Sequence, residues 1–165
     1  MKVLLDDIKI RTEPRAGDLG YVIYQHGDLY GREYHFGGHF EIYVAKGVAE
    51  FFENYDSSRD RIWLAEHDGR IIGSLVLMHR EDNTAQLRYF LIHPDYRGIG
   101  LGKRLMNQWM SFAHEVGYQR AFLLTADELD AAISLYKRHG FTLTSEHEST
   151  AFGRPLREQR YDAQL

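Results

Sequence analysis

Residues 97–103 (RGIGLGK) combine three alternating glycines with a cationic residue at each end. Glycine lets the backbone approach a ligand closely, and a helix N-terminus offers unpaired N–H groups at the positive end of its dipole. An apolar run ends at Pro94, just before this segment, and apolar residues recur at helical spacing from Leu101 onward. The pattern predicts an anion site between a strand and a helix, with a diphosphate as the natural ligand class.

Two common diphosphate-binding loops do not fit this spacing. A P-loop, Gly-x-x-x-x-Gly-Lys followed by Ser or Thr, would need glycine at Arg97 and a hydroxyl side chain at Arg104. A dinucleotide-binding loop, Gly-x-Gly-x-x-Gly, would need a third glycine at Lys103 or Leu105. It also normally follows the first strand of its fold, not the fourth. The spacing excludes both.

A third pattern fits. Arg-x-x-Gly-x-Gly is met by Arg97, Gly100 and Gly102. It resembles the coenzyme A motif of the GNAT (Gcn5-related) N-acetyltransferases. Residues 135–141 (LYKRHGF) resemble a second segment of that family, Leu-Tyr-x-x-x-Gly-Phe, and the order of elements over residues 8–141 agrees as well. Two linked motifs make this resemblance specific, and it covers most of the chain.

The resemblance implies a function. Acetyl-CoA would be the co-substrate, and a primary amine on a small molecule or peptide would accept the acetyl group directly in a ternary complex. Because the chain has no cysteine, a cysteinyl acyl-enzyme is excluded. A non-catalytic acyl-CoA-binding sensor or interaction module stays open as the alternative, since fold alone does not fix function.

Shorter stretches resemble one branch of the family, which is often fused behind a MarR-type winged-helix DNA-binding domain. They are residues 15–20 (RAGDLG), 26–27 (HG), 29–30 (LY), 33–34 (EY), 63–66 (WLAE), 87–88 (LR) and 152–153 (FG). A chain of 165 residues has no room for such a domain, so a stand-alone acetyltransferase is expected. Dimers are common among similar proteins, which leaves a homodimer open.

The resemblance also assigns the cofactor-binding residues. The strand before the glycines would hydrogen-bond the pantetheine arm through its backbone, and the loop would surround the pyrophosphate with N–H groups. A backbone N–H of Leu91 or Ile92 would stabilise the oxyanion of the reaction. The residues assigned to the cofactor are Phe90, Leu91, Ile92, Arg97, Gly98, Ile99, Gly100, Leu101, Gly102 and Lys103.

Tyr136 matches the family's tyrosine that protonates the departing coenzyme A thiolate. A phenol with a pKa near ~10 can protonate the thiolate of a thiol near ~8.5 only with help from the surrounding field. A core aromatic beside Leu135 is the structural alternative for this residue. Many family members carry Asn seven residues earlier, where this chain has Leu129, so that cofactor contact is unfilled.

The amine must lose a proton before it attacks, because an alkyl ammonium has a pKa near ~10.4. The glutamate that some relatives carry on the fifth strand falls at Leu124. Glu33 is the main candidate for the catalytic base, with Glu41 and His26 as others, because all three lie on or near the helices that wall the acceptor cleft. Each could equally be a solvated or structural group.

No metal site is expected. His35 and His39 have the i, i+4 spacing of a helical metal-binding pair, but Gly37 and Gly38 between them favour a loop. The absence of cysteine also excludes thiolate zinc sites and disulfides.

The composition fits one globular domain over residues 1–165, with 44% hydrophobic and 27% charged residues. A net charge of −4 argues against nucleic-acid binding, which needs a basic surface to displace counterions. Acidic residues follow the first five, so the start is unlike a signal peptide, and no apolar run approaches the ~18 residues of a membrane span. We therefore expect a soluble, cytoplasmic protein without membrane contact.

The rest of the sequence supplies elements to hold the loop. Apolar patterning predicts strands at 8–12, 61–66, 71–77, 85–92, 121–124, 141–144 and 159–161. Helical spacing predicts helices at 18–26, 40–55, 101–116 and 132–139, the first with Asp18 as its N-cap. Together with the resemblance, this order gives an α+β (α/β) fold: a GNAT-like mixed, mostly antiparallel central sheet flanked by helices.

Overall fold

A mixed sheet runs through residues 2–165, the part of the chain that the computed structural model describes. Its strand order is β1-β2-β3-β4-β5-β7-β6, and only the β4–β5 pairing is parallel. The strands are β1 (Lys9–Arg11), β2 (Arg61–His67), β3 (Arg70–Arg80), β4 (Thr84–Ile92), β5 (Arg120–Ala126), β6 (Thr142–Ser149) and β7 (Leu156–Gln164). The predicted α+β class with a mostly antiparallel sheet is confirmed.

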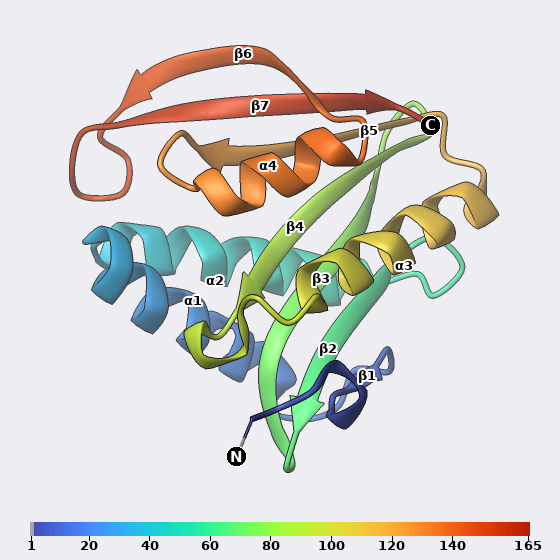
Figure 1. Ribbon diagram of the computed structural model, residues 1–165. Coiled ribbons are helices and arrows are strands. Elements are labelled where there is room, and N and C mark those ends of the chain that lie inside the picture. Colours follow the sequence, from blue (N-terminus) through green and yellow to red (C-terminus); the bar gives the residue numbers. More distant parts are fainter. Residues whose placement is uncertain (1) are drawn as a thin grey trace.

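Helices cover both faces of this sheet (Figure 1). They are α1 (Asp18–Tyr34), α2 (Gly38–Glu53), α3 (Leu101–Val116) and α4 (Asp130–Arg138), with 3-10 turns η1 (Leu5–Asp7) and η2 (Pro94–Tyr96). All the predicted elements are present, and the main difference is that α1 continues past His26 to Tyr34. No helix formed by residues 2–165 has the length and apolar character needed to cross a bilayer.

Both faces of the central strands are buried. In β2, Trp63 and Ala65 belong to the core that α3 and α4 form on one face of the sheet. Ile62 and Leu64 belong to the core that α1 and α2 form on the other face. Side chains alternate between the faces of a strand, so a strand covered on both sides reads as a continuous apolar run. This explains the unbroken apolar stretches of the sequence.

The sheet splits between β4 and β5 (Figure 1). Their parallel pairing ends at Leu87 and Leu123, although β4 continues to Ile92 and β5 to Ala126. Beyond that point, within the described chain, the β5-facing edge of β4 has no strand partner. A free strand edge of this kind can pair with an extended ligand.

A β-bulge in β4 lies where the split begins. Val76 of β3 pairs with Arg88 and Ser74 pairs with Leu91, so a single β3 residue faces both Tyr89 and Phe90. Tyr89 has φ 54°, and the Ser74 hydroxyl donates a hydrogen bond to its carbonyl at 2.7 Å. Bulges of this kind bend a strand and re-aim its side chains.

The prediction that Asp18 caps α1 is wrong. The N-cap is Gly17, with φ 92°, and Asp18 is the first helical residue. The Arg11 guanidinium donates to both Asp18 oxygens at 2.7 and 2.9 Å, and the Arg15 N–H donates at 2.6 Å. Burial raises the pKa of Asp18, but these bonds outweigh burial and leave it below its ordinary value. The carboxylate therefore joins β1 to α1.

Candidate functional site

The glycine-rich segment connects β4 to α3. Gly98 and Gly100 have φ of 78° and 93°, in the left-handed region where a Cβ is strained. Gly100 is the N-cap of α3, and no side chain caps this end. The first helical hydrogen bond of α3 is donated by the Arg104 N–H to the Gly100 carbonyl at 3.1 Å. The N–H groups at the start of α3 are therefore available to an anion.

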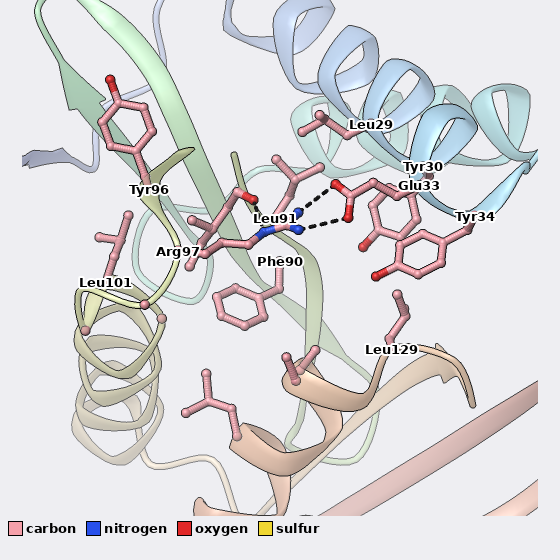
Figure 2. Close-up of a pocket in the computed structure, with 17 residues that line it drawn as sticks. Leu29, Tyr30, Glu33, Tyr34, Phe90, Leu91, Tyr96, Arg97, Leu101 and Leu129 are labelled. Carbon is pink, nitrogen blue, oxygen red and sulfur yellow. Dashed lines mark hydrogen bonds and ion pairs between the residues drawn. The ribbon is translucent and has the colours of Figure 1, made fainter. Parts of the chain in front are cut away.

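A cavity of about 250 Å³, here called the first cavity, lies beside this segment (Figure 2). Its walls come from α1, the end of β4, the glycine-rich segment and α4. Residues predicted to bind the cofactor that line it are Phe90, Leu91, Ile92, Arg97, Gly98, Gly100, Leu101 and Gly102. Ile99 packs against the core instead, and Lys103 lies exposed on α3.

Packing, not backbone conformation, explains the glycine at position 102. A Cβ there would lie 3.2 Å from Cδ2 of Leu135 and 3.4 Å from Cδ1 of Ile92. The absence of a side chain therefore lets α3 approach α4 and the end of β4. It also keeps the first cavity open at this point.

An ion pair crosses the first cavity. Arg97 donates from both terminal nitrogens to the two carboxylate oxygens of Glu33, each at 2.8 Å (Figure 2). Its Nε also donates to the Ile92 carbonyl at 2.9 Å. The bond to Glu33 is the main reason that the pKa of Arg97 is raised above its ordinary value. The pair holds α1 against the glycine-rich segment, and Glu33 faces the first cavity.

The open edge of β4 presents particular N–H groups to the split. The His93 N–H donates to the Ile72 carbonyl at 2.8 Å, so it points toward β3. N–H direction alternates along a regularly paired strand, and the pairing is regular from Leu91 to His93, so the Leu91 N–H also points toward β3 while the Ile92 N–H points toward the split. Of the two N–H groups predicted to stabilise the oxyanion, that of Leu91 therefore points away from the split.

A second cavity, of about 110 Å³, lies on the α1 and α2 side of the split. It shares four lining residues with the first cavity: Tyr30, Phe90, Leu129 and Ala132. Phe90 belongs to β4 just beyond the last β4–β5 pair, so the two cavities meet where the strands separate. Molecules bound in the two cavities would therefore lie next to each other at this junction.

Tyr136 lines the second cavity beside this junction. Its ring centroid lies 6.0 Å from that of Phe90 and 6.2 Å from that of Phe141. Burial raises the pKa of its phenol well above the ordinary value, so the hydroxyl keeps its proton. Leu129, at the position where the resemblance implies an Asn contact to the cofactor, is an apolar wall of both cavities.

His26 presents an unused nitrogen within the lining of the second cavity. Its Nδ1 lies 2.8 Å from the Val22 carbonyl, which can only accept, so Nδ1 carries the proton. Nε2 is buried without a hydrogen-bond partner, and so is the Tyr89 hydroxyl. Burial lowers the pKa of His26 to about 4, so the imidazole is neutral. Glu41, the remaining candidate base, lines neither cavity.

His26 should make stability pH-dependent. A histidine in the unfolded chain titrates near ~6.5, whereas folded His26 titrates at about 4. The unfolded state therefore binds this proton first, and the free energy of unfolding should fall by ~3 kcal/mol as pH drops from about 6.5 to 4. Denaturant unfolding across this range should give a flatter profile for His26→Gln. His114→Gln, at an exposed histidine, is the matched control. If the free energy of unfolding of His26→Gln depended on pH as strongly as that of the wild type, His26 would not be the group responsible.

Within residues 2–165, no three His, Asp or Glu side chains form a group that could hold a metal ion. His35 lies outside both helices, with φ 59°, whereas His39 is the second residue of α2. The two do not share a helix.

An uncapped helix start beside one cavity, with a second cavity at the split in the sheet, is suited to two substrates of which one carries a phosphate group. The family model for the acetyltransferase (GNAT) family matches residues 24–141. The chain therefore belongs to the acetyltransferase (GNAT) family. The comparisons with known proteins give no support for the branch that is fused to MarR-type regulators.

Curated relatives agree with this assignment. YjgM of Escherichia coli (strain K12), an uncharacterized N-acetyltransferase, is 32% identical over 107 residues, which are 63% of this chain and 62% of that protein. The amino-acid acetyltransferase of Shewanella oneidensis is 32% identical over 92 residues, 55% of this chain and 20% of that protein. In these matches the chain spans less than two thirds of the relatives' length.

Solved structures show the same fold. A GNAT acetyltransferase from Staphylococcus aureus Mu50 has a TM-score of 0.76 at 20% identity, over 96% of this chain and 99% of that one. A GNAT acetyltransferase from Elizabethkingia anophelis, with acetyl-CoA bound, has a TM-score of 0.67 at 15% identity, over 97% and 99%.

Proposed function

We propose that this protein transfers an acetyl group from acetyl-CoA to a primary amine, directly and in a ternary complex. The observation that carries the proposal is the meeting of the two cavities at Phe90, which lines both. The first adjoins the uncapped start of α3, where unpaired N–H groups suit a diphosphate. The second supplies a separate space for an acceptor, so both substrates can be bound at once.

The chain's own groups fit the bond changes of such a transfer. The amine nitrogen bonds to the acetyl carbon, the carbon–sulfur bond breaks, and the ammonium proton leaves for a base or solvent. The Ile92 N–H points toward the split and Phe90 lines both cavities, so we assign the oxyanion that forms on the acetyl carbonyl to the backbone N–H groups of these two residues. Tyr136 would give its proton to the departing sulfur.

His26 would orient the acceptor amine. With a pKa of about 4, its imidazole is too weak a base to deprotonate an alkyl ammonium directly at neutral pH. Its buried, unpartnered Nε2 can accept a hydrogen bond from an amine that has already lost its proton to water. This contact would fix the position of the amine nitrogen, while the buried surroundings would disfavour the charged ammonium.

The test of the proposal is an amine screen with acetyl-CoA. Free thiol release would be followed spectroscopically and the acetylated product identified by mass spectrometry. Amino acids belong in the screen because one relative is an amino-acid acetyltransferase. Transfer to at least one amine is expected. Tight acetyl-CoA binding without transfer to any amine would instead support the non-catalytic sensor.

Glu33→Gln separates two roles for Glu33. Both its oxygens bond Arg97 inside the first cavity, which favours a role in setting charge there over a role as general base. Removing one negative charge from an anion site should tighten acetyl-CoA binding about two- to fivefold and change kcat little. A general base would instead cost about 100-fold in kcat.

Calorimetry and steady-state kinetics measure these two effects separately. Glu41→Gln is the matched control, since it removes the same charge from a carboxylate outside both cavities. A large loss of kcat confined to Glu33→Gln would restore Glu33 as the base.

A further inference from the structure

Arg88 places a positive charge without a counter-ion in the second cavity. It is half-buried, it lines the cavity, and it makes no hydrogen bond or ion pair with any residue of the described chain 2–165. The lining also contains one carboxylate, Glu158, which lies 3.1 Å from Nε2 of His147 and forms no ion pair with Arg88. The cavity therefore carries one cation whose natural partner is an anion from outside the chain.

The Arg88 guanidinium is held in place by aromatic rings. Its Cζ lies 4.8 Å from the ring centroid of Tyr89 and 5.6 Å from that of Tyr43. Rings at these distances attract a guanidinium and restrict its orientation, yet leave its N–H donors free. The side chain is thus positioned as a planar donor for a carboxylate.

The backbone around Arg88 makes room for this arrangement. The bulge in β4 leaves Tyr89 in the α1 and α2 core, on the same side as Arg88. On α2, a Cβ at Gly47 would lie 2.0 Å from the Tyr89 hydroxyl and 2.7 Å from Nη2 of Arg88. A glycine inside a helix costs about 1 kcal/mol relative to alanine, so its presence here marks a close approach of side chains.

The same ring links the cation to the proposed amine site. The His26 ring meets Tyr89 edge-on at 5.7 Å, so Tyr89 contacts both Arg88 and His26. A ligand that spans this ring would meet the unpartnered guanidinium at one end and the unpartnered Nε2 at the other. The remaining walls include the apolar rings of Phe36, Phe40 and Phe152.

We infer that the acceptor is an amino acid or a similar amine that carries a carboxylate, which Arg88 binds. The inference rests on the proposed function and adds the chemical class of the acceptor. A bidentate guanidinium–carboxylate contact combines charge with directional hydrogen bonds. It would orient the acceptor so that its amine faces His26 and the cavity junction.

The test compares each acid with its own amide. L-Phenylalanine, L-leucine and L-methionine would be assayed against the corresponding amides, which keep the amine and side chain but lack the carboxylate. The acids should have kcat/KM at least about tenfold higher than the amides, because a lost charge-assisted bond typically costs that much. Arg88→Met should remove the difference by lowering kcat/KM for the acids alone, and Arg88→Lys should restore part of it.

Two further variants test whether the effect is specific to Arg88. Arg61→Met removes an arginine that lies over the Phe112 ring at 4.0 Å, outside the second cavity, and should leave the preference intact. Gly47→Ala places a Cβ 2.0 Å from the Tyr89 hydroxyl and 2.7 Å from Nη2 of Arg88, so it should displace both side chains and lower the preference.

The outcomes distinguish the two proposals. Amides used as well as acids, a preference that survives Arg88→Met, or transfer only to amines of other classes would each overturn the carboxylate site and leave the acetyltransferase standing. Acetyl-CoA binding without transfer to any amine would overturn both.

Discussion

Replacing Gly100 by valine is expected to weaken acetyl-CoA binding at least ~30-fold, or by about 2 kcal/mol. Gly100 has φ 93° as the N-cap of α3. The left-handed conformation costs an ordinary residue about 1–2 kcal/mol and a β-branched one more. In the variant, either the left-handed conformation is kept at this energetic cost, or the peptide at position 100 rotates out of it. If the peptide turns, the N–H groups that follow lose the common direction an anion requires.

The opposite end of the same helix supplies the control. Gly117 has φ 91°, and a Cβ there would meet no atom within 4 Å. Gly117→Val therefore imposes the same backbone strain on α3, away from the first cavity. Calorimetric titration with acetyl-CoA should show near-normal affinity for Gly117→Val and a large loss for Gly100→Val. Equal affinities in the two variants would remove the glycine-rich segment from the binding site.

The parts of the fold that follow local rules were predictable from the sequence. The spacing of apolar residues from Leu101 to Val116 predicted the bounds of α3, because apolar residues that recur with a period of 3.6 lie on one face of a helix. The uncapped start of α3 was predictable for the same reason, because glycines before a helix start act through the backbone of one short segment. Both features depend on neighbours in sequence.

Features that depend on neighbours in space were not predictable. Asp18 has the residue type of an N-cap, yet Arg11 of β1 takes its carboxylate, and no local pattern indicates that pairing. The bulge at Tyr89 is also absent from the apolar pattern, because alternation along β4 assumes regular pairing with β3. The sequence therefore predicted Arg88 only as part of a regular strand, and its position in the lining of a cavity is known only from the fold.

The candidate bases show the same limit. The sequence offered Glu33 as the main candidate, with Glu41 and His26 as others, only because each is a titratable residue on or near α1 or α2. Packing separates them: Glu33 is bonded to Arg97 in the first cavity, Glu41 lies outside both cavities, and His26 is buried in the second. Burial and pairing decide what a titratable group can do, and both are tertiary properties.

Tyr136→Phe is expected to lower kcat by about 100-fold or more and leave acetyl-CoA affinity within about threefold, because the role proposed for Tyr136 is that of a proton donor used only during reaction. Burial raises the pKa of Tyr136, which makes the phenol a weaker acid in its resting state. The same apolar surroundings also disfavour a thiolate and raise the pKa of its thiol. Donor and acceptor therefore shift together, and proton transfer stays feasible at the junction.

The control for Tyr136→Phe must remove a buried phenol hydroxyl elsewhere. Tyr118 is similarly buried, and its hydroxyl donates to the Arg59 carbonyl at 2.7 Å, away from both cavities. Tyr118→Phe should cost about 1 kcal/mol of stability and leave kcat unchanged. Because the phenol stays protonated, the wild-type pH profile should show no limb from Tyr136 in the neutral range. Full turnover by Tyr136→Phe would mean that water protonates the sulfur and that Tyr136 only packs between Phe90 and Phe141.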